Sequence, residues 1–227
     1  MNLIAISGKA NSGKNTIASI INKLTNNKYE EKSFANKLKD IVCLLIGCTR
    51  EELEDREFKE KELSEEWWYY TNTLFYNENK KLIPYLKTDK SLHNNTNWYI
   101  IKLTPRLLLQ LLGTECGRQI IHPNIWINSL FVDYKGHFIG TVNNKKQYGK
   151  KLPNWIITDL RFKNELEAIK NRNGIIIRIN RNNIQLSNHL SETDLDNSTF
   201  DYVIDNNSSI EELEEKIKQI LLTEKII

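Results

Sequence analysis

Short apolar runs alternate along the chain with stretches whose apolar residues recur at helical spacing. The first apolar run covers residues 3–6, and apolar residues then recur at Ile17, Ile20, Ile21 and Leu24. A short continuous run is typical of a buried strand, and the wider spacing is typical of an amphipathic helix. By the same criteria we expect further strands at 155–158, 175–179 and 202–204, and further helices at 34–46, from 104, around 166–169 and from 209.

Local signals mark the ends of two predicted helices. Thr104 and Pro105 suit the N-cap and the first helical position, and Gly113 is expected to end or kink that helix. Ser209 and Glu212 have the spacing of a capping box, which predicts the start of the last helix.

Strands that alternate with helices predict an α/β fold with a parallel sheet, in which ligands bind at the carboxyl ends of the strands.

Two stretches break the alternation of strands and helices. Residues 50–103 are charged and then rich in Trp and Tyr, while residues 133–153 are polar and basic and suggest a hairpin. We therefore expect a single domain with a core at about 1–49 and 104–227, an insertion at about 50–103 and a hairpin insertion at about 133–153.

Composition and charge narrow the class of protein. The 227 residues are 40% hydrophobic and 27% charged, which is sufficient for a buried core. A net charge of +3 is too dilute for a dedicated nucleic-acid binder. The longest apolar run, residues 41–48, is shorter than the ~20 residues of a membrane span, and no basic segment of a signal peptide precedes the first strand. Three cysteines without a Cys-x-x-Cys pair fit reduced thiols better than disulfides or zinc ligands.

A glycine-rich motif directly follows the first predicted strand and directly precedes a predicted helix. Residues 8–14 read Gly-Lys-Ala-Asn-Ser-Gly-Lys and match the G-x-x-x-x-G-K pattern of a phosphate-binding loop. In such a loop, backbone N–H groups and the helix N-terminus face the phosphates, and the lysine reaches their outer oxygens. The alternative is an ordinary glycine turn between a strand and a helix, which would need neither Lys14 nor this context.

The residue after Lys14 departs from the usual pattern. Asn15 stands where Ser or Thr commonly ligates Mg²⁺, and the hydroxyl comes one position later, at Thr16. Because Mg²⁺ keeps several waters in such sites, we expect it to be held largely through water by Asn15, Thr16 and a carboxylate elsewhere. This departure counts against a GTPase-type switch, which depends on the direct ligand.

A second polar segment follows the strand predicted at 155–158. Asp159 and Arg161 are two residues apart at its carboxyl end, so an extended backbone would point both side chains the same way. A carboxylate there could organise the waters of Mg²⁺, and an arginine could clamp a phosphate. The alternative is a surface ion pair at the end of the strand.

These motifs, taken together, resemble the deoxynucleoside monophosphate kinases of viruses and phages, within the P-loop nucleoside-monophosphate-kinase-like group. The matching segments are residues 6–16, 33–35 with 38–40, 56 with 59–60, 104–118 with 124–126, 158–165, 189–192 and 201–206. The block from Thr104-Pro105-Arg106 to Gly117-Arg118 is the most specific of them. Two features depart from the family pattern: Asn15, where the family often has Asp, and the long Trp- and Tyr-rich stretch before Thr104.

The resemblance implies a fold and a set of site residues. The fold is a P-loop kinase three-layer sandwich with a mostly parallel central sheet and inserted acceptor-binding and lid segments. The implied catalytic residues are Lys14, Asp159 and Arg161. The implied ATP-binding residues are Gly8, Lys9, Asn11, Ser12, Gly13, Lys14, Asn15, Thr16, Arg181 and Asn206. The implied acceptor-binding residues are Phe34, Lys39, Arg56, Arg106, Gln110, Thr114, Arg118, Trp126 and Arg161.

Chemistry supports part of this set independently, because a monophosphate carries about two negative charges and several arginines must converge on it. Gln110 lies one helical turn after Arg106 and could read a base edge. Other roles remain open for several of these residues. The arginines could be solvated surface residues, and Phe34 and Trp126 could belong to the hydrophobic core. His189 could be structural rather than part of a lid over the ATP, and Asn206 could form an Asx turn rather than contact the nucleotide. For the aromatic residues 67–70 we expect packing or a dimer contact rather than base stacking.

The resulting expectation is an enzyme that transfers the γ-phosphoryl group of ATP, with Mg²⁺, to a deoxynucleoside 5′-monophosphate. One alternative is a P-loop kinase of another phosphorylated metabolite, such as a coenzyme precursor, and a second is a non-catalytic nucleotide-binding switch. We expect a cytoplasmic location (the host cytoplasm for a viral protein) and no nucleic-acid or membrane partner. The sequence leaves open whether the protein forms a homodimer.

Overall fold

The computed structural model describes the chain except for residues 1, 72–85, 88–97, 143–144 and 183–192. The chain forms two compact units. The first consists of residues 1–37 and 122–227, and the second of residues 38–121. The expectation of one domain with an insertion at about 50–103 stays a prediction. None of the helices in the described ranges is long and apolar enough to cross a membrane.

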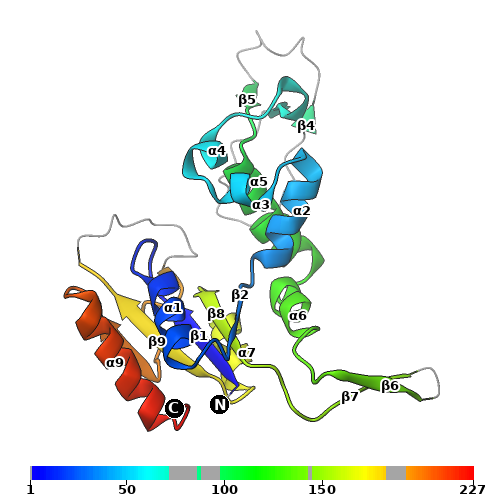
Figure 1. Cartoon of the computed structure of the whole chain (residues 1–227). Coiled ribbons are helices and arrows are strands. Elements are labelled where there is room, and N and C mark those ends of the chain that lie inside the picture. The colour runs from blue at the N-terminus through cyan, green and yellow to red at the C-terminus, as the bar shows by residue number, and fades with distance from the viewer. Residues whose placement is uncertain (1, 72–85, 88–97, 143–144, 183–192) are drawn as a thin grey trace. The chain divides into compact units, whose positions relative to one another are not determined.

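A five-stranded sheet, parallel throughout, forms the centre of the first unit (Figure 1). Its strand order is β10-β9-β1-β8-β2. The strands are β1 (Leu3–Ser7), β2 (Glu30–Lys32), β8 (Trp155–Leu160), β9 (Ile175–Asn180) and β10 (Tyr202–Asp205). This is the α/β fold of the P-loop kinases that the sequence predicts, with β1 in the middle of the sheet.

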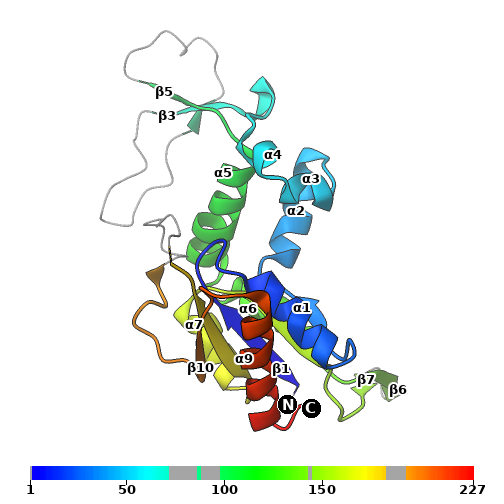
Figure 2. The ribbon, with the colours of Figure 1, turned by 60° about the vertical axis from the view of Figure 1, so that its left-hand side comes forward.

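Helices cover both faces of this sheet. Helix α1 (Lys14–Leu24) packs beside α9 (Ile210–Thr223) (Figures 1 and 2). The side chains of Ile17 and Ile217 lie with Ile4 in one buried cluster. Helix α7 (Lys163–Lys170) packs on the opposite face. Its Ile169 lies near Leu3, which alternates with Ile4 along β1 and therefore points the other way. The three layers confirm the predicted sandwich.

Two further elements complete the first unit. Helix α6 (Ile125–Phe131) precedes the antiparallel hairpin of β6 (Phe138–Val142) and β7 (Lys145–Tyr148). An antiparallel strand pair therefore lies within residues 133–153, and the role of this segment as an insertion stays a prediction.

The second unit is mostly helical. The chain enters it within α2 (Asn36–Ile46), which is followed by the short helices α3 (Arg50–Glu54), α4 (Arg56–Glu60) and η1 (Glu65–Trp67). A three-stranded antiparallel sheet has the order β4-β3-β5, formed by β4 (Leu86–Lys87), β3 (Tyr69–Thr71) and β5 (Tyr99–Ile101). Tyr69 and Tyr70 are buried, whereas Phe75 and Tyr76 of the aromatic stretch lie outside the described residues.

The helix that begins at Thr104 corrects one prediction. The side chain of Thr104 accepts a hydrogen bond from the Leu107 N–H, as expected of an N-cap, and α5 covers Pro105–Gln110. The helical stretch does not end at Gly113. It continues as a π-helix, η3 (Leu111–Ile121), in which Gly113 is buried and lies so close to Leu38 that a Cβ would approach its Cδ2 to 2.9 Å. Gly113 thus allows close packing of two helices rather than stopping one.

Candidate functional site

The loop between β1 and α1 has the geometry of a phosphate-binding loop. Gly13 has a φ of +107°, a conformation that residues with a Cβ rarely adopt. A Cβ on Gly8 would lie 2.5 Å from Oγ of Ser12 and 2.8 Å from the carbonyl oxygen of Ile179. Both glycines of the motif are therefore required by the backbone itself. The loop closes with a hydrogen bond from the Ser12 N–H to the Lys9 carbonyl (3.3 Å).

The side chain of Lys14 lies over this loop. Its Nζ donates hydrogen bonds to the carbonyl oxygens of Gly8 and Lys9, each at 2.7 Å. Such bonds from a charged donor hold the ammonium group in the curve of the loop. The amine of Lys14 thus lies where the motif places the cation that faces the outer phosphates of a nucleotide.

Ser12 provides an independent sign that the loop is shaped for a ligand. Its residue is fully buried, and its Oγ has no hydrogen-bond partner among the described residues. A buried hydroxyl without a partner is costly, and a phosphate oxygen in the loop would satisfy it. This arrangement fits the phosphates of a nucleotide.

A pocket of about 850 Å³ lies beside the loop, at the ends of α1, β9 and α9. Asn206, directly after β10, donates from Nδ2 to the Ser12 carbonyl at 2.9 Å, and Arg181 donates to the Asn11 carbonyl at 3.4 Å. The structure therefore brings two distant residues of the predicted ATP-binding set to the phosphate loop. The pocket is lined by Asn11, Gly13, Thr16, Arg181, Asn182, Asn206, Asn207, Ser208, Ile210 and Leu213. His189 lies outside the described residues.

The metal candidates differ in their surroundings. Thr16 is half-buried and lines the pocket, whereas Asn15 is exposed. Within the described ranges, no group of three or more His, Cys, Asp or Glu residues is placed to hold a metal ion. Mg²⁺ is commonly bound beside nucleotide phosphates through phosphate oxygens, water and a hydroxyl, and the Thr16 hydroxyl lies beside the loop.

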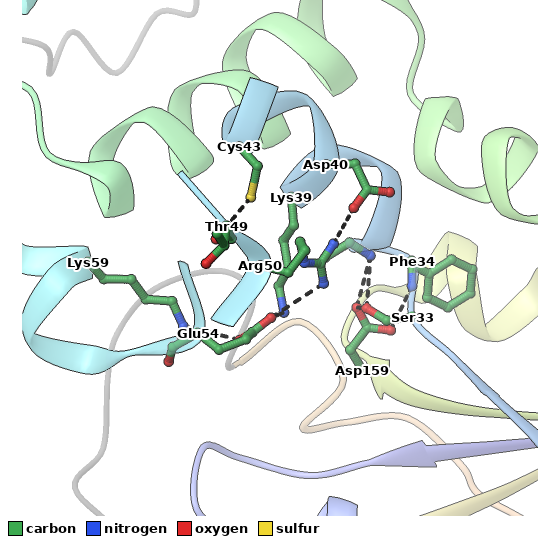
Figure 3. A network of polar contacts seen from close by, with 11 residues as sticks. Ser33, Phe34, Lys39, Asp40, Cys43, Thr49, Arg50, Glu54, Lys59 and Asp159 are labelled. Carbon is green, nitrogen blue, oxygen red and sulfur yellow. Dashed lines mark hydrogen bonds and ion pairs between the residues drawn. The ribbon is translucent and has the colours of Figure 1, made fainter. Parts of the chain in front are cut away.

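Asp159, near the end of β8, binds the turn that leads into α2 (Figure 3). Its Oδ1 accepts the Phe34 N–H at 2.8 Å, and its Oδ2 accepts the Ser33 hydroxyl at 2.5 Å and the Ala35 N–H at 3.0 Å. A carboxylate has about four acceptor positions, so one position, on Oδ1, is left for water. In the described structure these bonds of Asp159 go to this turn and not to the surface ion pair that was the alternative to a role at the metal.

The segment after Asp159 fixes the backbone of Arg161. The buried carboxylate of Glu165 accepts the N–H groups of Arg161 (2.9 Å) and Phe162 (3.1 Å). These bonds secure the passage from β8 into α7. The backbone that carries the half-buried side chain of Arg161 is thus held in place at the carboxyl end of the sheet.

Sequence reasoning missed one cationic group next to the loop. Arg178 of β9 donates to the Ser7 hydroxyl at 3.0 Å and to Asp196 at 3.1 Å, and Lys9 lies 3.5 Å from the same carboxylate. The guanidinium of Arg178 is thereby held against the last residue of β1. The signal in the sequence was a lone arginine within the isoleucine run 175–179.

The predicted acceptor-binding residues fall into two groups. Phe34 and Trp126 belong to the first unit and are only 3% and 6% exposed, and Phe34 packs edge-on against Phe131 at 6.2 Å between ring centroids. Core packing, the alternative for both residues, is the role that their burial favours. The remaining candidates apart from Arg161 lie in the second unit: Lys39, Arg56, Arg106, Gln110, Thr114 and Arg118.

Several cations of the second unit are held by acceptors of the chain itself. Lys39 bonds to Glu54 at 2.6 Å, and Arg106 is paired with Glu60. Arg118 donates to the Gly113 carbonyl at 2.9 Å. Arg56 and Gln110 are exposed on the surface of the same unit, and Thr114 is half-buried.

Among the three cysteines, Cys48 is unlike a catalytic nucleophile. Cys43, Cys48 and Cys116 are all free thiols, as the sequence predicts. Burial and a hydrogen bond with Cys43 raise the pKa of Cys48 to about 11, so this thiol stays protonated at neutral pH.

Comparisons with known proteins agree with this geometry. A family model described as deoxynucleotide monophosphate kinase matches residues 61–217. The deoxynucleoside-5′-monophosphate kinase of Escherichia phage T5 is 28% identical over 195 residues, covering 75% of this chain and 72% of that protein. A protein of Acanthamoeba polyphaga mimivirus, provisionally named a deoxynucleotide monophosphate kinase, is 28% identical over 229 residues and covers 96% of this chain. The deoxynucleotide monophosphate kinase of Enterobacteria phage T4 is 27% identical over 256 residues, covering 97% of this chain and 99% of its own.

These relatives are viral proteins named as kinases, and two of them align with nearly the whole chain. With a phosphate loop on a parallel five-stranded sheet and a family match over most of its length, the chain is a kinase and belongs to the deoxynucleotide monophosphate kinase family.

Proposed function

We propose that the protein transfers the γ-phosphoryl group of ATP to a deoxynucleoside 5′-monophosphate, giving the diphosphate and ADP. The observation that carries the proposal is the phosphate loop: Lys14 lies over it, the Ser12 hydroxyl is unpaired, and Asn206 and Arg181 border the adjoining pocket. The family to which the chain belongs supports the choice of acceptor.

Catalysis in this proposal consists of positioning and charge neutralisation. The loop N–H groups and Lys14 hold the β- and γ-phosphates, and Arg161 braces the transferred group as its charge spreads over its oxygens. Thr16, and Asp159 through a water on its remaining Oδ1 position, are the residues that would hold Mg²⁺, with Asn15 at the exposed edge. Mg²⁺ itself neutralises part of the phosphate charge.

The acceptor would be recognised by the cationic residues of the second unit. A monophosphate dianion needs several positive donors, and the candidates for contacting the acceptor as a whole include Lys39, Arg106 and Arg118. The option of a homodimer and the cytoplasmic location stay predictions. Size-exclusion chromatography with light scattering measures the first, and fractionation of infected or expressing cells measures the second.

The test is ADP release from ATP and Mg²⁺ with each deoxynucleoside and ribonucleoside monophosphate in turn. Lys14→Ala removes the loop cation, and Lys23→Ala is the matched control because Lys23 lies on the same helix, is exposed and, among the described residues, forms an ion pair with the half-buried Glu214. We expect release that depends on one or more deoxynucleotides, is lost in Lys14→Ala and is retained in Lys23→Ala. ATP binding without release across the whole panel would instead indicate another phosphorylated acceptor or a switch.

A further inference from the structure

Three cations of the second unit converge on a single carboxylate, that of Glu54 (Figure 3). Oε1 of Glu54 lies 2.6 Å from Lys39 Nζ and 3.4 Å from Arg50 Nη2, and Oε2 lies 3.4 Å from Lys59 Nζ. Lys59 also donates to the main-chain carbonyl of Glu54 at 3.2 Å. The cations come from three successive helices, α2, α3 and α4.

Helix caps fix the positions of these side chains. Thr49 and Glu52 form a reciprocal capping box at the start of α3, with hydrogen bonds of 3.1 and 2.8 Å. Asp55 accepts the Phe58 N–H at 2.7 Å and caps α4. The fully buried Leu53 anchors α3. The cluster is therefore part of the folded framework of the second unit.

The ion pairs named here join three cations to two carboxylates. Lys39, Arg50 and Lys59 bring three positive charges, whereas Glu54 and Asp40, which Arg50 contacts at 2.7 Å, bring two negative ones. The side chains of Lys39 and Lys59 are 24% and 17% exposed, but that of Glu54 is 48% exposed. The two lysines are thus more buried than the carboxylate, and another anion could take the place of the carboxylate from the solvent side.

The protonation of Glu54 agrees with its role as a counter-ion. Burial acts to raise its pKa, but the hydrogen bond and charge of Lys39 and the charge of Lys59 outweigh burial and lower the pKa below 4.5. Glu54 is therefore an anion at neutral pH. The same pairing recurs at the other end of α4, where Glu60 holds Arg106.

We propose that Lys39, Arg50 and Lys59 form the binding site for the phosphate group of the acceptor, and that Glu54 is an internal competitor for it. A phosphate dianion has one more charge and one more free oxygen than a carboxylate, so it satisfies three cationic donors better. Glu54 moves toward solvent when the phosphate binds and sets the affinity for the acceptor. This inference rests on the proposed function for the identity of the phosphate carrier.

The test is Glu54→Gln, which keeps the size of the side chain and removes its charge. We expect inorganic phosphate, measured by titration calorimetry, to bind about three- to tenfold more tightly to Glu54→Gln than to the wild type, and the KM for the monophosphate to fall by about the same factor at an unchanged kcat. Glu57→Gln, on α4 but outside the cluster, is the matched control and should change neither value. Adding Lys39→Met to Glu54→Gln should abolish the gain in phosphate binding.

Loss of the counter-ion leaves three cations close together, so Glu54→Gln is also expected to melt at a lower temperature than the wild type. Phosphate should then raise its melting temperature more than that of the wild type. Phosphate binding that is no tighter in Glu54→Gln would overturn the proposal. Tighter phosphate binding with an unchanged KM for every monophosphate would overturn the assignment to the acceptor. Calorimetry with phosphate needs no turnover, so these results are independent of whether phosphoryl transfer is observed.

Discussion

The Ser33 hydroxyl donates a hydrogen bond of 2.5 Å to Oδ2 of Asp159, a residue 126 positions further along the chain. With the N–H groups of Phe34 and Ala35 on the same carboxylate, it joins the end of β8 to the turn that starts α2. A residue expected to take part in catalysis thus also shapes the backbone. Its substitution should therefore affect folding as well as catalysis.

We expect Asp159→Ala to lower the free energy of unfolding by about 2–4 kcal/mol, because three donors lose a charged acceptor at once. Urea unfolding followed by circular dichroism measures this change. Asp133→Ala is the matched control, since Asp133 makes an exposed ion pair with Lys37 and should cost under about 1 kcal/mol. Equal losses in the two variants would show that the Asp159 bonds contribute no more than a surface pair.

Much of the first unit could be predicted from the sequence because its signals are local. The isoleucine-rich strands β1, β8 and β9 were predicted from their short apolar runs, and α9 from its capping box and helical spacing. Strand β2 was not, since Glu30-Glu31-Lys32 is polar and lies at the edge of the sheet, where no apolar run is required. Of the two roles expected of Gly113, ending its helix was wrong, because a glycine that allows two helices to approach has the same sequence signal as one that ends a helix.

The part of the nucleotide site that the phosphate-loop motif defines could be predicted from the sequence. The glycines and Lys14 follow from their spacing. The partners of Asp159 and Arg178 depend on which strands lie next to each other, and this information is not local. Phe34 is buried, and the sequence could not show this, because an aromatic residue near a motif can pack in the core as well as contact a ligand.

Gly13→Ala is expected to damage the nucleotide pocket directly. A Cβ at this position would meet Nδ2 of Asn206 at 2.7 Å, and the φ of +107° adds backbone strain. We expect the free energy of unfolding to fall by about 2–3 kcal/mol and ATP affinity to fall at least about tenfold, because Asn206 is pushed off the Ser12 carbonyl. Thermal unfolding and ATP titration calorimetry measure the two effects.

The control for this change is Gly47→Ala. Gly47 also has a positive φ, of +69°, but a Cβ there would meet nothing within 4 Å. We expect a cost of about 1 kcal/mol from strain alone and unchanged ATP binding. If Gly13→Ala bound ATP as well as Gly47→Ala does, the close approach of Asn206 would not matter for the nucleotide.

Thr16→Val tests the hydroxyl expected to serve the metal. Valine preserves the shape of threonine but removes the oxygen, and Thr16 lines the pocket beside the loop. We expect the Mg²⁺ concentration that gives half-maximal ADP release to rise about five- to tenfold, and chelation of Mg²⁺ to abolish release in every variant. Ser19→Ala, on an exposed position of the same helix, should leave the Mg²⁺ dependence unchanged. An unaltered Mg²⁺ dependence in Thr16→Val would exclude the hydroxyl from the metal site.

The lowered pKa of Glu54 predicts a pH dependence of stability with a defined sign. Lys39 and Lys59 favour the ionised carboxylate in the folded chain, so the pKa lies below the ordinary value of 4.5. A folded-state pKa below the unfolded one contributes stability that is fully present above about pH 5, and is lost as the pH falls through the folded value. Because the side chain is 48% exposed, we expect this contribution to be under about 1 kcal/mol.

The measurement is the free energy of unfolding of the wild type and Glu54→Gln between pH 7 and pH 3. Glutamine has no charge to lose, so the advantage of the wild type at pH 7 should shrink below about pH 5 and vanish once Glu54 is protonated in both states. Other carboxylates titrate equally in the two proteins and cancel in the difference. A constant difference over the whole range would mean that the three cations do not stabilise the charge of Glu54, and would remove the electrostatic basis for its role as a competitor of phosphate.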